Sequence, residues 1–226
     1  MVQQIRAVRP ELFVLVMSAT LAAKPVADYL DDAPIIESVG RTYPVTVKYT
    51  PELDRRRIDE ILVEKIPSLF AQHAGDCLVF LPGVGEIRNC RQALTDWADR
   101  NDVLLEELYG DLPPDRQERV LQPQSSRKVI LSTNVAETSL TIEGITLVVD
   151  SGLARVLRYD ETSGLDRLDL EPISKASADQ RGGRAGRLQA GTCLRLWPEA
   201  AHRHRADFDT PEIRRVDLAG MVLQLF

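Results

Sequence analysis

The stretch CLVFLPGVGEIRNCRQALTDWADR, residues 77–100, contains the pattern that decides the fold. Its first five residues form a continuous apolar run, which is typical of a strand buried on both faces of a parallel sheet. The residues from Val84 to Arg100 then have the apolar spacing of a helix. A strand followed directly by a helix is the repeating unit of parallel α/β sheets.

The same alternation continues on both sides of this stretch. A helix is predicted before it, over Leu53–Phe70, and further strands and one short helix after it: Val103–Leu108, Pro114–Leu121, Lys128–Leu131 and Leu147–Val149. The sequence therefore predicts an α/β fold, a parallel sheet flanked by helices with right-handed crossovers. In such folds ligands bind at the carboxyl ends of the strands.

The flanks of this core have other patterns. The apolar run Leu12–Met17 predicts the last strand of a preceding domain, and Ile35–Val39 with Val45–Tyr49 predicts an extended linker. Ala154–Pro172 alternates around a turn that contains glycine, which predicts a projecting β-hairpin. Asp209–Phe226 has helical spacing behind a capping Thr-Pro-Glu and predicts the start of a winged-helix-like domain. The expected division is 1–42, 43–200 and 201–226.

Composition limits the possible functions. The 226 residues have a net charge of -6, so any contact with nucleic acid must be local rather than driven by overall charge. Residues 1–20 resemble neither a signal peptide nor a membrane span. The widely spaced Cys77, Cys90 and Cys193 suggest no disulfide framework and fit a reducing cytoplasm. His202 and His204 have no further ligand at metal-binding spacing, so no metal site is predicted.

The strongest functional signal is QRGGRAGR, residues 180–187. Its three arginines are separated by small residues, which concentrates positive charge where a phosphate can come close to the backbone. Arg184 and Arg187 are three positions apart and would share one face of a helix, where two guanidinium groups can hold one phosphate. The alternative is a solvated basic start of a helix, and the residue types alone leave both readings open.

This motif resembles motif VI of superfamily 2 helicases, in the form QRxGRxGR of the DEAH-box branch. Four further segments resemble that branch in the same order: SAT at 18–20, FLPG at 80–83, STNVAETSLTIEGI at 132–145, and DSG at 150–152 with the hairpin after it. The resemblance covers essentially the whole chain and is most specific in the last two motifs. In detail, the residues of these motifs are most similar to those of the bacterial HrpB-type helicases.

The resemblance implies a RecA-like domain and a role for each matching residue. Gln180, Arg184 and Arg187 would face the γ-phosphate of ATP, with both arginines as arginine fingers. Thr141 and Glu143 would contact the ribose of the nucleotide. The family commonly has Asp at the second of these positions, so this chain keeps the carboxylate on a longer side chain. Glu143 as a plain exposed acid is the alternative.

The resemblance also implies contacts with nucleic acid. Gly83, Thr133 and Asn134 would hold the backbone of single-stranded RNA or DNA, although Thr133 and Asn134 are equally suited to capping a helix. Ser18 and Thr20 would couple the nucleotide site to this surface. The hairpin would separate strands, but a purely structural hairpin is nearly as consistent with the pattern.

The sequence contains neither a GxxxxGK[ST] loop nor an Asp-Glu-x-His run. The resemblance therefore implies the second RecA-like half of a longer ATP-dependent helicase, with RNA as the favoured substrate. Its partner would be the first RecA-like domain of the same parent chain, which would hold most ligands of the Mg²⁺ that accompanies ATP. The chain alone should not hydrolyse ATP, because phosphoryl transfer needs all these parts together. A non-hydrolysing nucleic-acid-binding scaffold and a protein-translocating ATPase are the alternatives.

Overall fold

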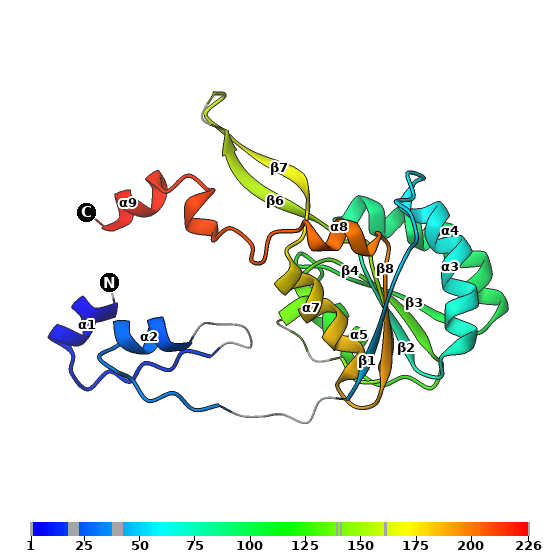
Figure 1. The fold of residues 1–226 in the computed structure, drawn as a ribbon, viewed down its shortest axis with the longest axis horizontal. Helices are drawn as coiled ribbons and strands as arrows, with labels where there is room; N and C mark the ends of the chain where they lie inside the picture. Colours follow the sequence, from blue (N-terminus) through cyan, green and yellow to red (C-terminus); the bar gives the residue numbers. More distant parts are fainter. Residues whose placement is uncertain are drawn as a thin grey trace. The chain divides into compact units, whose positions relative to one another are not determined.

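The computed structural model describes residues 2–17, 23–37, 43–138, 140, 142–160 and 162–225. The chain divides into two compact units, Met1–Arg41 and Thr42–Phe226. Each unit is described by itself below, and both are drawn in Figure 1.

In its described residues, the first unit has two short helices, α1 (Val2–Val8) and α2 (Ala23–Tyr29). The predicted strand over Leu12–Met17 is wrong for this structure, because these residues form no strand and Phe13 and Met17 are 97% and 81% exposed. An apolar run becomes a buried strand only where neighbouring strands supply hydrogen-bond partners on both sides. The apolar run is suited to a position between two strands, but it does not itself supply those neighbouring strands.

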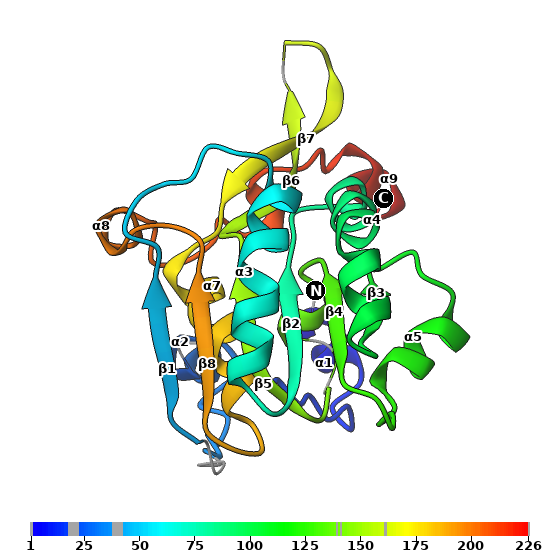
Figure 2. The ribbon, with the colours of Figure 1, turned by 90° about the vertical axis from the view of Figure 1, so that its right-hand side faces the viewer.

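The second unit is built on a parallel sheet of six strands in the order β1-β8-β5-β2-β4-β3, seen face-on in Figure 2. This arrangement confirms the predicted parallel α/β fold. The strands are β1 (Val45–Tyr49), β2 (Asp76–Phe80), β3 (Leu104–Leu108), β4 (Lys128–Ser132), β5 (Ile145–Asp150) and β8 (Gly191–Arg195).

Strand β1 corrects the prediction that Val45–Tyr49 belongs to a linker. It pairs in parallel with β8 over its whole length, from Val45 beside Gly191 to Tyr49 beside Arg195. Pro44 precedes the strand, a position where the missing backbone N–H costs no ladder bond. The deciding factor is the free edge of β8, a long-range partner that no local pattern reveals.

Helices cover both faces of the sheet. Helices α3 (Ile58–Gln72) and α4 (Val84–Arg100) lie on one face, and α5 (Pro114–Leu121) with α7 (Lys175–Gly183) lies on the other (Figure 1). The strands alternate between two cores. In β2, Cys77 and Val79 join the core beneath α3 and α4, whereas Leu78 and Phe80 join the opposite core. This period-two alternation follows from strand geometry, and it explains why central strands are apolar throughout.

The predicted hairpin is confirmed. Strands β6 (Leu153–Asp160) and β7 (Leu165–Pro172) pair in antiparallel register as a separate two-stranded sheet. Figure 1 shows this hairpin projecting from the body of the domain. Its first strand begins three residues after β5 ends, so the hairpin grows directly out of the carboxyl edge of the main sheet.

After β8 the chain forms α8 (Glu199–Arg203), a 3₁₀ turn η2 (Glu212–Arg214) and α9 (Ala219–Leu225). The single helix predicted from Asp209 onward is therefore wrong. Asp217 accepts a hydrogen bond from the backbone N–H of Ala219 at 2.9 Å, which starts a new helix at that point. This local cap competes with the apolar periodicity and divides the segment.

Cys77, Cys90 and Cys193 are all buried and none forms a disulfide. Burial raises the pKa of each thiol, to about 12 for Cys90, so these side chains act as small packing groups. Considering only the helices that the structure describes, we find none that is long and apolar enough to cross a bilayer.

Candidate functional site

The two segments that contain the predicted nucleic-acid-binding residues lie side by side at the carboxyl edge of the sheet. Strands β2 and β4 are neighbours, with Phe80 beside Ser132, and the backbone N–H of Leu81 donates to Ser132 O at 2.8 Å. Gly83 follows the first strand and Thr133 follows the second. The parallel topology therefore brings together residues fifty positions apart, at the edge where such sheets bind ligands.

The side chain of Asn134 is exposed at this edge, and Thr133 is half-buried. Helix α6 (Val135–Thr138) begins with main-chain bonding, because Asn134 O accepts from Glu137 N at 2.9 Å. The strand contact and the helix cap both stay predictions for Thr133 and Asn134. Asn134 lines a cavity of about 210 Å³ together with Arg155, Arg158 and Arg215.

Gly83 is buried and extended, and it precedes α4 as its N-cap residue. A Cβ atom at this position would meet Arg155 Nε at 2.8 Å. Arg155 belongs to the hairpin and donates from Nη2 to Glu86 Oε1 at 2.9 Å. The lack of a side chain at Gly83 therefore admits a hairpin arginine in this conformation, and a phosphate at the same place would compete with it.

The arginine motif begins at the same cavity, which Arg181 also lines. Helix α7 contains Arg181, and a 3₁₀ turn η1 (Arg184–Gly186) follows it directly. Gly186 O accepts from the backbone N–H of Tyr43 at 2.9 Å, just before β1 begins. The motif thus ends near the amino ends of β1 and β8, away from the carboxyl edge that carries Asn134.

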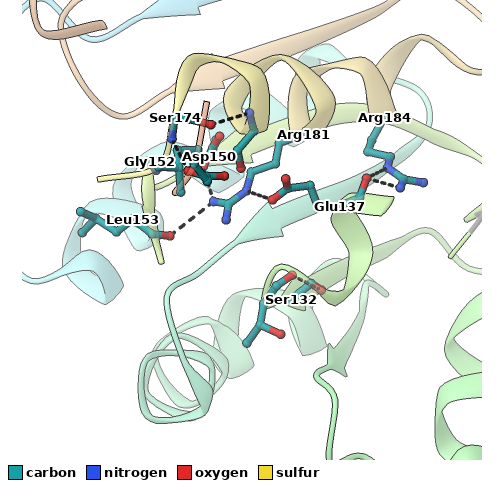
Figure 3. Close-up of polar contacts among 12 residues, drawn as sticks. Ser132, Glu137, Asp150, Gly152, Leu153, Ser174, Arg181 and Arg184 are labelled. Atoms are coloured by element: carbon teal, nitrogen blue, oxygen red, sulfur yellow. Dashed lines mark hydrogen bonds and ion pairs between the residues drawn. The ribbon is translucent and has the colours of Figure 1, made fainter. Parts of the chain in front are cut away.

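Arg184 is nearly fully buried, and its guanidinium is bonded to the main chain of the 132–145 segment (Figure 3). Its Nε donates to Glu137 O at 2.8 Å, Nη2 donates to the same carbonyl, and Nη1 donates to Leu140 O at 2.5 Å. The two long motifs recognised in the sequence are therefore physically joined by this side chain.

Arg184 and Arg187 are close enough for their charges to interact. Burial lowers the pKa of Arg184 to about 10, with the positive charge of Arg187 as the next cause. The two differ in environment, because Arg187 is exposed while Arg184 is 5% exposed. Arg184 begins the 3₁₀ turn η1 and Arg187 follows its last residue, so their common face stays a prediction. Gln180, one turn earlier on α7, is half-buried.

The other predicted residues fall in two groups. Glu143 is exposed in the turn before β5, at the amino end of that strand. Its position leaves both of its readings, ribose contact and solvated acid, as predictions. Thr141, Ser18 and Thr20 lie outside the described residues.

No separate role was predicted for Arg181, which is the most deeply buried of the three arginines of the motif, at 1% exposure. Its Nε donates to Glu137 Oε2 at 2.9 Å, and its Nη1 donates to Asp150 Oδ1 at 3.1 Å and to Leu153 O at 3.3 Å (Figure 3). Its guanidinium carbon also lies 4.9 Å from the centre of the Phe80 ring. One side chain therefore joins α7, α6, the end of β5 and the start of the hairpin.

Charge balance explains why Arg181 tolerates this burial. Burial opposes its charged form, but Asp150 and Glu137 outweigh that effect and raise the pKa of the guanidinium. A buried ion that keeps its partners is acceptable, whereas one left alone is expensive. The sequence signal was present in part, since Asp150 ends an apolar strand where an unpaired carboxylate would be unfavourable.

The sheet topology, the flanking helices and the arginine-bearing helix before the last strand define a RecA-like α/β domain. Residues 58–189 match the family described as "Helicase conserved C-terminal domain". This match covers more than half of the chain, and the chain therefore belongs to the helicase conserved C-terminal domain family.

Curated relatives agree with this membership. The chain is 42% identical over 222 residues to the ATP-dependent RNA helicase HrpA of Escherichia coli, covering 96% of this chain and 17% of that protein. It is also 42% identical over 219 residues to the ATP-dependent RNA helicase HrpB of the same organism, covering 96% of this chain and 27% of HrpB. The chain thus spans between about a sixth and a quarter of the length of these relatives.

A solved structure is similar over nearly all of the chain. The crystal structure of Escherichia coli DEAH/RHA helicase HrpB has a TM-score of 0.90 and 41% identity, and the match covers 99% of this chain and 29% of that one. The resemblance to HrpB-type DEAH helicases and the RecA-like fold are confirmed by these similarities.

Proposed function

We propose that this chain acts as the second RecA-like domain of an ATP-dependent RNA helicase. In that role it would supply two arginine fingers and half of the groove for a single strand. The observation that carries the proposal is the pair of neighbouring cations, Arg184 and Arg187, on a turn tied to the 132–145 segment. The charge of Arg187 contributes to the lowered pKa of Arg184, and two neighbouring cations form a place that favours a polyanion.

The arginine pair suits the triphosphate of ATP, and the exposed Glu143 suits its ribose hydroxyls. Bound ATP would supply the phosphoanhydride bond whose cleavage drives movement, with Mg²⁺ held mostly by residues outside this chain. Arg187 would stabilise the charge that develops on the transferred phosphoryl group. Arg184 would do the same after exchanging one of its carbonyl contacts, and it meanwhile holds the loop that ends near Glu143.

Gly83, Thr133 and Asn134 would contact the strand at the carboxyl edge. Backbone amides and short polar side chains bind phosphates without reading bases, which suits a protein that moves along any sequence. The β6–β7 hairpin beside this edge would separate strands. In this proposal α7 extends from the strand-binding edge toward the arginine pair. One helix would therefore couple the two sites.

The alternative is a RecA-like module that binds nucleic acid without hydrolysing ATP. The engagement of Arg184 with the main chain favours it, because a finger must be available to phosphate. The proximity of Arg187 to Arg184 is not accounted for by this alternative.

The test is ATP hydrolysis by the full-length protein that contains this chain, with and without single-stranded RNA. Arg187→Ala should lower RNA-stimulated turnover by about 10³-fold or more, the contribution typical of an arginine finger. Arg187→Ala is easier to interpret than Arg184→Ala. The second variant should lower turnover similarly, but it would also remove the contacts that hold the main chain at Glu137. Arg203→Ala is the control, because Arg203 is exposed and, among the described residues, its ion pair is with Glu199 on its own helix.

Each result has a clear meaning. Full turnover in Arg187→Ala would show that Arg187 is no finger. RNA binding without any ATP hydrolysis by the natural protein would favour the scaffold module instead.

A further inference from the structure

The two strands of the hairpin leave the main domain at one point. Gly152 immediately precedes β6, and Ile173 immediately follows β7. The backbone N–H of Ile173 donates to Gly152 O at 3.0 Å, which closes the base of the hairpin. These two residues join the hairpin to the domain, so a tilt of the hairpin against the sheet requires their backbone to move.

A single arginine from a distant part of the chain bonds to both residues. Arg205 Nη1 donates to Gly152 O at 2.9 Å and to Ile173 O at 2.7 Å. Arg205 lies in the loop after α8 and outside every motif recognised in the sequence. A planar guanidinium is suited to this double contact, because its donors are fixed relative to one another.

The surroundings hold Arg205 in this position. Its guanidinium carbon lies 4.2 Å from the centre of the Trp197 ring, and Trp197 is 2% exposed. Gly152 has φ of +72°, and a Cβ there would meet Arg205 Nη2 and Trp197 Cε3 at 2.5 Å each. The turn is thus shaped so that the guanidinium and the indole pack directly against its backbone.

A second arginine reaches the same base from the motif 180–187. Arg181 donates to Leu153 O, the first residue of β6, and shares Asp150 Oδ1 with the backbone N–H of Gly152, which lies 2.8 Å from that oxygen (Figure 3). The base of the hairpin is therefore fixed on one side to α7 and on the other to the loop after α8.

We infer that Arg205 is a positioning residue that fixes the angle of the β6–β7 hairpin, so that movement of α7 is passed to the hairpin instead of being absorbed at its base. The inference rests on the proposed helicase function and adds a residue to it. Arg205 touches neither nucleotide nor strand in this role. It acts by joining both legs of the hairpin to the domain.

The informative variant is Arg205→Lys in the full-length protein. A lysine keeps the charge and most of the stem, but its ammonium ends one bond short of the Nη1 position and lacks the planar group that lies over the Trp197 ring. RNA-stimulated ATP hydrolysis should stay within about twofold of the natural rate, whereas base pairs unwound per ATP should fall by about tenfold, as expected for one lost charge-assisted bond. Arg203→Ala, two residues away, should change neither quantity.

Amide hydrogen exchange tests the structural part independently of activity. In Arg205→Lys, the amides of β6 and β7 should exchange about tenfold faster or more, while those of β2, β4 and β5 keep their natural protection. Unchanged hairpin exchange would overturn the inference, whether or not the protein unwinds RNA. Equal loss of protection in hairpin and sheet, or a parallel fall of hydrolysis and unwinding, would also overturn it by showing a general stabilising role.

The two proposals fail in different ways. A natural protein with no RNA-stimulated hydrolysis would contradict the proposed function, and the exchange experiment would still decide the role of Arg205. A natural protein that unwinds RNA and an Arg205→Lys protein with the same unwinding per ATP would contradict only the role of Arg205.

Discussion

The carboxyl edge of the sheet and the α7–η1 segment both carry predicted phosphate contacts, but they are built in different ways. At the edge, Asn134 is exposed and its placement comes from the main chain at the end of β4. In α7–η1, Arg181 and Arg184 are buried and themselves hold neighbouring segments in place. At the carboxyl edge the main chain positions exposed side chains. In α7–η1 the buried side chains themselves hold the structure together.

This difference predicts how each region responds to substitution. Removing an exposed polar side chain from the edge should affect binding and leave folding intact. Removing a buried guanidinium leaves carboxylates or carbonyls without partners, so folding and function should suffer together. Loss of activity alone therefore cannot identify a catalytic arginine in this domain, and stability must be measured beside it.

The largest effect is expected for Arg181→Met. The variant keeps the apolar volume but leaves the buried Asp150 and Glu137 unpaired, which should lower the free energy of unfolding by about 3–5 kcal/mol. Denaturant unfolding measures this change, with Arg203→Ala expected to be indistinguishable from the natural protein. A small loss for Arg181→Met would contradict the view that α7–η1 is held together by buried charge.

An intermediate effect is expected for Gly186→Ala. A Cβ at Gly186 would meet the carbonyl oxygen of Tyr43 at 2.5 Å, and this backbone atom cannot rotate away. Overpacking of this kind should cost about 1–3 kcal/mol of stability. Gly183→Ala is the matched control, because no atom lies within 4 Å of its added Cβ, and a helical alanine should be neutral or stabilising. Equal melting temperatures for the two variants would remove the proposed close contact between η1 and the chain before β1.

The smallest effect is expected for Asn134→Ala. Its melting temperature should be unchanged, while binding of single-stranded RNA by the full-length protein should weaken roughly three- to tenfold, the value of one hydrogen bond. Fluorescence anisotropy with a labelled oligonucleotide measures this directly. A fall in stability without a change in RNA affinity would contradict this expectation. It would show that Asn134 has a structural role, as proposed for the buried arginines.

Sequence periodicity predicted the regular elements well where local and long-range forces agree. The helix Val84–Arg100 and the hairpin within 153–172 were found nearly to the residue, because their apolar spacing and turn residues are local properties. The strand over Leu12–Met17 and the linker over Val45–Tyr49 were both wrong. In each case the outcome depended on whether another strand was available as a hydrogen-bond partner.

The candidate site shows the same limit. The motif 180–187 identified the arginines as a group, but their spacing did not show that Arg181 meets Asp150 and Glu137, or that Arg184 bonds to the main chain near Glu137. Those contacts join positions 31 to 47 residues apart. Arg205 carried no motif at all, and only its contacts with Gly152 and Ile173 single it out.

The sequence by itself determined the α/β class, the order of most elements and the helicase family, because apolar periodicity and long motifs are written along the chain. The tertiary structure alone decided which arginines are buried and which edge of β8 is covered. It also decided how the hairpin is attached. These properties depend on which distant groups share a low-dielectric interior, where a charge must find a partner or remain at the surface.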